Sequence, residues 1–200
     1  MTLTTAGAGN ITSASGKNVT TTAGANSGAV SGAVTMSTNS GNIALAGDVI
    51  TTGAANNAAT ASAGGQVDLT ANSGTLAVAN ITTSGGAGTG QNGGNAANIN
   101  LTTAGGTNDL TVNGTLTALG GTGTSAGTGG TVTLVATGAV SDATTGVVKA
   151  DGLKVSAVNS SSLNSATNDV VTVTATPAAF PSADVGTYNI TSTLTLGGAS

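Results

Sequence analysis

Short segments in which apolar and polar residues alternate recur at regular distances along the chain. Within residues 98–117, Ile99 and Leu101 alternate with polar residues, and residues 110–112 repeat the pattern. A third apolar segment begins at Leu116. Alternation with a period of two is typical of β-strands that have one buried face. The pattern therefore predicts three short strands separated by turns that contain Gly and Asn.

The same three-strand unit recurs about every 32 residues. The first strand opens 33, 32 and 33 residues apart at Val34, Val67, Ile99 and Val132. The second is marked by Ile43, Leu76 and Leu110, and the third by Ile50, Ile81 and Leu116. The N-terminal segment fits the same frame through Leu3, Ile11 and Val19, which lie 31, 32 and 31 residues before Val34, Ile43 and Ile50. Like residues at like positions indicate parallel stacking in a solenoid rather than antiparallel meanders.

The rest of each repeat is a run rich in Gly, Ala, Ser and Asn. These runs cover residues 24–32, 53–65, 84–97 and 120–130. A fully extended turn of one repeat would have a perimeter of roughly 100 Å, too wide for five aliphatic side chains to fill. We therefore expect three strands to form the wall, while the Gly-rich run leaves it as a loop or flattened hairpin. Alternating Ala in residues 59–63 leaves open a strand within one excursion.

The frame changes after Val135. Spacings fall to about 20 residues, with Leu153 and Val173 lying 20 apart and Val148 and Val170 lying 22 apart. We expect three regions: solenoid repeats with Gly-rich excursions in 1–135, plain solenoid coils in 136–176, and a cap or further module in 177–200. The last region holds both prolines and the only Phe and Tyr, a change of composition that suggests a boundary.

Composition narrows the classes of function. Aromatic residues make up 1% and charged residues 5% of the chain, so only a thin core can be filled. Seven Asp against three Lys give a net charge of −4, which argues against nucleic acid as a partner and against a polybasic membrane anchor. No apolar window is long enough for a helix to span a membrane. The chain has no Cys, so it has neither disulfides nor thiolate metal sites.

The N-terminus lacks the charged and apolar regions of a signal peptide and joins the repeat at once. We expect the chain to be a piece of a longer protein whose export signal lies elsewhere.

The chain has few residues that could act as acids, bases or nucleophiles in catalysis. The chain has no His, Cys, Glu or Arg, so acid–base work would depend on Asp48, Asp68, Asp109, Asp142, Asp151, Asp169 and Asp184. None of the first three shares a repeat position with another, whereas β-helix enzymes that cleave sugars cluster carboxylates on neighbouring coils. We expect no enzyme, and no catalytic, cofactor-binding or metal-ligating residues.

Two Gly-rich motifs have structural interpretations. Residues 105–110 are similar to the nonapeptide of calcium-binding β-rolls, but only one copy is present and Asn stands at its fourth place. Residues 85–90 lack the Lys-Ser/Thr ending and the following helix of a phosphate-binding loop. We interpret the first motif as a turn and the second as a loop.

Recurrent Thr positions offer a candidate binding surface. The third strand predicts a stacked column of Thr20, Thr51, Thr82 and Thr117, as on an ice-binding face. The residues two positions on are Thr22, Gly53, Ser84 and Leu119, which interrupt a two-column grid. Thr is also a good β-former on an exposed wall, and this is the interpretation we favour. Asn10, Asn42 and Asn98, which precede strands, are interpreted as turn residues.

Three segments carry a family resemblance. Residues 41–45, residues 130–134, and residues 150–155 through 168–170 resemble the repeats of filamentous-haemagglutinin-like bacterial surface proteins. The resemblance covers about residues 1–176. It implies a right-handed parallel β-helix, export to the cell exterior, and a role in attachment or in an extracellular layer. No secretion domain of that family is visible at the N-terminus. Residues 184–191 look like a strand of bacterial immunoglobulin-like repeats, so 177–200 is a cap or the start of such a module.

The expected fold is therefore all-β, a right-handed parallel β-helix (β-solenoid) with three short strands per coil. The expected function is a structural or adhesive segment of a bacterial surface fibre, located outside the cell or on its surface. Its partners would be a host or matrix surface, and further copies joined end to end through unpaired solenoid edges. The alternative is an extracellular module that binds glycans through its excursion loops or ice through a Thr face. Sugar sites usually use aromatic platforms, and Phe180 and Tyr188 lie outside the repeat.

Overall fold

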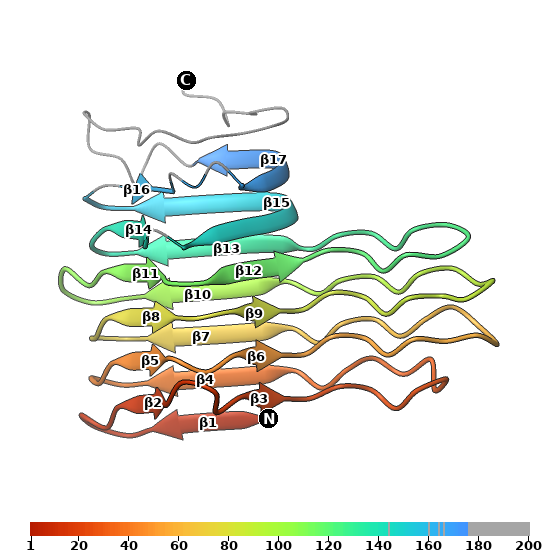
Figure 1. The fold of residues 1–200 in the computed structure, drawn as a ribbon. Helices are drawn as coiled ribbons and strands as arrows, with labels where there is room; N and C mark the ends of the chain where they lie inside the picture. Colours follow the sequence, from red (N-terminus) through yellow and green to blue (C-terminus); the bar gives the residue numbers. More distant parts are fainter. Residues whose placement is uncertain (144, 160, 164, 166, 176–200) are drawn as a thin grey trace.

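The computed structural model describes residues 1–175 except 144, 160, 164 and 166. The cap or module expected at 177–200 lies outside these residues. The described chain forms 17 β-strands and no helix. All strand pairs are parallel, and successive coils stack into a solenoid, as the sequence predicts (Figure 1).

The first strands of the coils form one continuous ladder. It contains β1 (Thr2–Thr5), β4 (Val34–Thr38), β7 (Val67–Ala71), β10 (Ile99–Thr103), β13 (Thr131–Ala136) and the second half of β15 (Val147–Ala157). The predicted register of Val34, Val67, Ile99 and Val132 is confirmed. The prediction for the first coil is wrong, because Leu3 pairs with Met36 and not with Val34. Both partners are apolar positions of the same strand, so hydrophobicity alone did not separate them.

The second strands form a separate sheet. It contains β2 (Ile11–Ser13), β5 (Ile43–Leu45), β8 (Leu76–Val78), β11 (Leu110–Val112), β14 (Val140–Asp142) and β16 (Ser161–Ser162). Ile11, Ile43, Leu76 and Leu110 are in register, as predicted.

The third ladder corrects the sequence analysis by one residue. It contains β3 (Val19–Thr20), β6 (Val49–Ile50), β9 (Ile81–Thr82), β12 (Thr115–Ala118) and the first half of β15. Val49, rather than Ile50, pairs with Val19 and Ile81. Val49 is buried and Ile50 is only partly buried. Two consecutive β-branched apolar residues carry no alternation, so the turn before them sets which one faces inward.

The core is a thin column of aliphatic side chains. Parallel pairing places like residues one above another, and Leu69, Leu101 and Leu134 are all fully buried in adjacent coils. Small residues such as Ala71 and Ala118 complete the narrow interior. This agrees with a chain that has few large side chains.

The coils after β13 lack excursions. β15 runs without a break from the third ladder into the first, and β17 (Asp169–Ala175) pairs along it. Leu153 pairs with Val173, as predicted. Val170 pairs with Ala150, so the predicted pairing of Val148 with Val170 is wrong. Val148 instead donates its backbone N–H to Asn168 Oδ1 at 2.8 Å.

In the first four coils an excursion leaves the wall between the third and first ladders. The excursions cover residues 21–33, 51–66, 83–98 and 119–130, and they stack into a flat projection that we call the fin (Figure 1). The expected loop or hairpin is thus found. Residues 59–63 do not form a strand, and an isolated bridge between Asn56 and Gly88 is the one β-feature in that excursion.

Candidate functional site

The fin has hydrogen bonding with a period of three residues. In the outgoing legs, Gly53 N–H donates to Ser84 O and Asn56 N–H donates to Ala87 O, at 2.8 and 3.0 Å. In the return legs, the N–H groups of Ala61 and Gly64 donate to the next excursion, each at 2.9 Å. A β-strand would repeat every two residues. A period of three is that of the polyproline II conformation, which has three residues per turn and no internal hydrogen bonds.

The two legs of each excursion also bond to each other. Ser62 N–H donates to Ala54 O, and three residues later Gly65 N–H donates to Thr51 O. A third set of hydrogen bonds runs diagonally between neighbouring coils. For example, Gly86 N–H donates to Ser62 O at 2.9 Å. The fin is therefore a hydrogen-bonded bundle of extended legs, and not a set of independent loops.

Glycine is required inside this bundle. A Cβ at Gly85 would fall within 3.0 Å of the Gly94 carbonyl oxygen, and one at Gly94 would fall equally close to the Ser62 carbonyl oxygen. The legs approach too closely for any side chain at these positions. Ser62 is also buried within the fin, and its Oγ has no hydrogen-bond partner within the described chain.

Threonine hydroxyls hold the two legs together at the base of the fin. Thr51 Oγ1 donates to Gly65 O at 2.5 Å, Thr83 Oγ1 donates to Ala97 O at 2.7 Å, and Thr21 makes the equivalent bond to Gly32. Thr51 therefore faces inward and is buried. The predicted four-residue Thr column is wrong, because Ile50 stands in register between Thr20 and Thr82.

The described carboxylates lie apart, and most of them bind a group of a neighbouring coil. Two of them accept side-chain amides of the next coil, with Asp68 Oδ1 2.8 Å from Asn100 Nδ2 and Asp48 Oδ1 3.0 Å from Asn80 Nδ2. Backbone N–H groups donate to three more, in the pairs Ala139 to Asp109, Ser165 to Asp142 and Gly129 to Asp151. No set of three or more His, Cys, Asp or Glu in the described ranges could hold a metal ion. Asp184 lies outside those ranges.

The Asn residues before strands do more than turn the chain. Asn10 Oδ1 accepts the N–H of Asn42, and Asn42 Oδ1 accepts the N–H of Thr75, at 2.8 and 2.9 Å. Asn98 Oδ1 similarly accepts the N–H of Thr131 at 2.9 Å. Each amide thus ties its corner to the coil above. The signal in the sequence is the recurrence of Asn or Asp just before strands at the coil spacing.

The two Gly-rich motifs take different places. Residues 105–109 lie in the turn between β10 and β11 and Leu110 begins β11, with Gly105 and Gly106 both at φ 68° and Asn108 Nδ2 donating to Ala104 O. Residues 85–90 lie in the third excursion, where Gly85 and Gly88 donate their N–H groups to the fourth.

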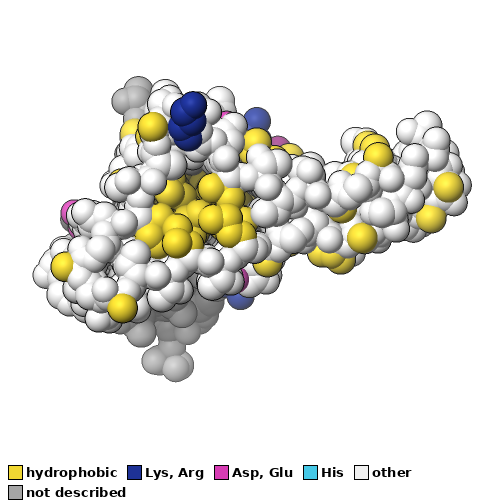
Figure 2. Space-filling model, turned by 90° about the horizontal axis from the view of Figure 1, so that it is seen from below, with side chains coloured by type: hydrophobic (Ala, Val, Ile, Leu, Met, Phe, Trp, Pro, Cys, Tyr) yellow, Lys and Arg dark blue, Asp and Glu magenta, His cyan; other side chains and the backbone are white. Residues whose placement is uncertain are grey.

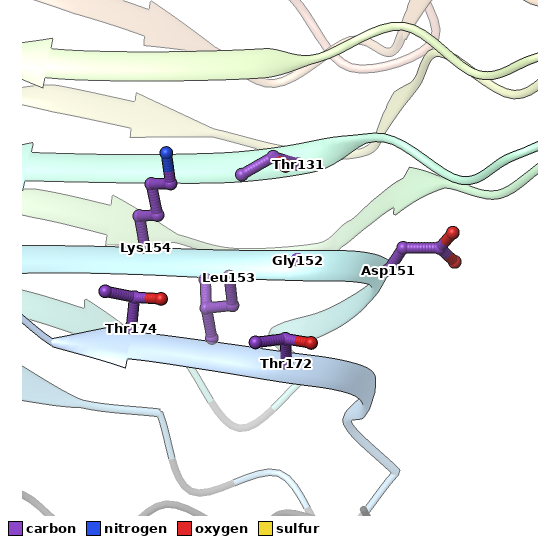
Figure 3. Close-up of a pocket in the computed structure, with 7 residues that line it drawn as sticks. All are labelled: Thr131, Asp151, Gly152, Leu153, Lys154, Thr172 and Thr174. Atoms are coloured by element: carbon purple, nitrogen blue, oxygen red, sulfur yellow. The ribbon is translucent and has the colours of Figure 1, made fainter. Parts of the chain in front are cut away.

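The outer surface has a shallow hollow above Gly152 (Figure 3). It measures about 270 Å³ and is lined mainly by Thr131, Thr172 and Thr174. Asp151 and Lys154 lie at its margin, and Figure 3 shows their side chains pointing in different directions. The hollow has no convergent set of charged groups.

The N-terminal end of the solenoid exposes the apolar interior. Figure 2 looks onto this end and shows hydrophobic side chains gathered at its centre. Met1 is 55% and Leu3 is 39% exposed. Within the described chain, β1, β2 and β3 pair with β4, β5 and β6.

The described part of the chain contains no helix that could cross a membrane. Comparison of the chain with protein-family models, curated proteins and solved structures found no match.

Proposed function

We propose that this chain is a structural and adhesive segment of an exported bacterial surface fibre, working at the cell surface or outside the cell. The observation that carries the proposal is the continuous hydrogen bonding between coils, which runs through three ladders of wall strands and through the fin. Side-chain amides at the corners add to it. Polar groups that could serve a reaction are instead used to join one coil to the next.

This arrangement suits a mechanical role. The backbone hydrogen bonds between coils run along the solenoid axis, so tension along the axis acts on many of them at once. Each is worth only about 0.5–1.5 kcal/mol net, but the bonds of one interface share the load. Resistance therefore grows with the number of bonds per coil, and the fin adds to that number.

Association into filaments would use the ends of a solenoid. Unpaired strand edges are templates for further strands. We propose end-to-end contact between copies through such edges, and attachment of the fibre to a host or matrix surface.

The alternative is an extracellular binding module for glycans or ice. Its ice-binding form depended on an unbroken Thr column, which Ile50 interrupts. Neither of the chain's two aromatic residues lies in the repeats. No observation favours this alternative over the structural role.

Electron microscopy of the purified chain over a concentration series tests the proposal. We expect rods that lengthen into filaments with an axial repeat of about 4.8 Å. Globular particles at every concentration would contradict the structural role. Beads coated with the chain should also be retained on matrix-coated surfaces more strongly than beads coated with heat-unfolded chain, and equal retention would contradict the adhesive role.

A further inference from the structure

The last excursion of the fin, residues 119–130, has an uncovered upper side. Each lower excursion has another excursion stacked on it. The coil above the last one has none, because β15 turns the corner without leaving the wall (Figure 1). We call the upper side of residues 119–127 the ledge. The excursions beneath it and the coils above it all belong to the described chain.

Burial along the ledge shows that a layer is missing. Gly85 in the third excursion is buried, whereas Gly120 at the equivalent position is only partly buried. Gly94 is buried, and its equivalent Gly127 is only partly buried. All four residues are glycines, so the difference reflects what covers them and not the size of a side chain.

The ledge has two backbone donors with the three-residue spacing of the fin. In the third excursion, the N–H groups of Gly85 and Gly88 donate to the fourth excursion at 3.0 and 2.8 Å. Gly120 and Gly123 hold these positions in the last excursion, and no described residue accepts a hydrogen bond from either N–H. Three residues make one turn of polyproline II, so the two donors face the same way, about 9 Å apart.

The return leg of the last excursion offers fewer donors. The N–H of Gly129 already donates to the Asp151 carboxylate. Ala126 is left as the one donor of this leg that has no acceptor among the described residues at the equivalent position. A segment bound to the ledge would therefore follow the outgoing leg, with its two donors.

The ledge also has one acceptor, which fixes where a bound segment needs glycine. In the interface beneath, Gly121 N–H donates to Gly94 O at 2.8 Å. Gly127 O is the equivalent acceptor, and no described group donates to it. A Cβ at Gly121 would fall within 3.0 Å of Gly86 O in the leg below. The residue that donates to Gly127 O must be glycine for the same reason, because its Cβ would meet Gly121 O.

We propose that the ledge binds a glycine-containing peptide segment of another protein in the polyproline II conformation. Two carbonyls of the segment, three residues apart, accept the N–H groups of Gly120 and Gly123. The residue just before the second carbonyl is glycine, and its N–H donates to Gly127 O. This partner chemistry continues an interface already present in the fin, since the third and fourth excursions meet in the same way.

The segment needs no charges to match the ledge. None of the four excursions contains Asp, Glu, Lys or Arg. A segment that already populates polyproline II loses little conformational freedom on binding. Three backbone hydrogen bonds that replace bonds to water still give weak binding, with an expected Kd of about 1 mM. The inference goes beyond the fibre role and does not rest on it.

A capped peptide with the sequence of residues 82–91 is the probe, because it contains the outgoing leg of the third excursion. Bound in the register of the fin, its Ser84 and Ala87 carbonyls accept from the ledge and its Gly86 donates to Gly127 O. The matched control is the same peptide with Gly86→Ala. It keeps every carbonyl but places a Cβ against Gly121 O.

Amide hydrogen exchange of the full-length chain, followed by NMR, gives the readout. At about 10 mM wild-type peptide we expect exchange at Gly120 and Gly123 to slow about tenfold. The Gly86→Ala peptide should bind about tenfold more weakly and slow exchange only about twofold. Exchange at Gly85 and Gly88, which are bonded inside the fin, should not change.

Two outcomes would overturn the inference. The first is unchanged exchange at Gly120 and Gly123 with the wild-type peptide. The second is equal slowing by both peptides, which would show that a bound segment does not adopt the register of the fin. Either outcome leaves the proposed fibre role intact, because that role is tested by the formation of filaments.

Discussion

The Asp151 carboxylate accepts a hydrogen bond from the Gly129 backbone N–H at 2.7 Å. In the three coils below, the equivalent N–H groups of Ser31, Gly64 and Ala96 donate to a carbonyl of the next excursion. Asp151 thus takes the place of a carbonyl at the last excursion of the described chain. The side chain terminates part of the fin edge and satisfies one donor that would otherwise be left open.

Replacing this acceptor should loosen the last excursion. We expect the Gly129 amide to exchange its hydrogen about tenfold faster in Asp151→Ala, because a hydrogen bond to a carboxylate is lost. Asp151→Asn keeps an acceptor oxygen and should retain most of the protection. Amide exchange followed by NMR would measure this, and equal exchange in the wild type and Asp151→Ala would show that the carboxylate does not protect this edge.

Glycine substitutions should separate the interior of the fin from its surface. Gly94→Ala places a Cβ within 3.0 Å of the Ser62 carbonyl oxygen, so we expect a loss of about 1–3 kcal/mol or more in the free energy of unfolding. Gly24→Ala meets no atom closer than 4.0 Å and serves as the control. Its unfolding free energy should change by less than about 1 kcal/mol. Urea unfolding would compare the two, and similar losses would argue against close packing of the legs.

Removing the buried hydroxyl of Ser62 should stabilise the protein. The Oγ atom is buried and has no partner among the described residues, and leaving such a group unsatisfied costs about 1–3 kcal/mol. We expect Ser62→Ala to raise the free energy of unfolding by up to about that amount. Thr83→Val is the comparison, because it removes a hydroxyl that does donate, to Ala97 O, and should lower stability by about 1 kcal/mol. A loss of stability in Ser62→Ala would show that the hydroxyl is satisfied in solution.

The inward ladder of the first strands should dominate stability. Leu101 is fully buried between Leu69 and Leu134 in the adjacent coils, so Leu101→Ala should cost about 2–5 kcal/mol. Thr102 lies on the outer face of the same strand, and Thr102→Ala should change stability by about 0.5 kcal/mol or less. Chemical unfolding of both variants provides the measurement. Equal effects would be incompatible with the register described above.

The wall could be predicted from the sequence where alternation is clean. Ile99 and Leu101 have polar neighbours, so their inward direction and their register follow directly from the pattern. Val49 and Ile50 are adjacent and equally apolar, so alternation does not distinguish them, and the prediction that placed Ile50 in register with Ile81 was wrong by one residue. The internal order of the fin could not be read from hydrophobicity at all, because its contacts are made by backbone groups. The recurrence of Gly53, Gly85 and Gly120 at the coil spacing was the available sign that side chains are excluded there.

For the carboxylates too, the sequence predicts the repeat positions but not the hydrogen-bond partners. The sequence predicts that Asp48, Asp68 and Asp109 occupy different repeat positions, and in the structure each binds a different neighbour in the coil above. Their partners could not be inferred, because those bonds depend on the exact height of each turn. Asp151 in particular acquires its role only from the absence of an excursion in its own coil.

Because the fin legs repeat every three residues, the length of the fin can change only in fixed steps if its hydrogen bonds are kept. Adding three residues to each leg extends both legs by one full turn of the polyproline II helix, or about 9 Å, and leaves every donor facing the same neighbour. Adding one or two residues to a leg would rotate its outer donors away from their acceptors. Natural or engineered variants of this chain can therefore set the reach of the fin in discrete steps, while the solenoid wall that carries it stays unchanged.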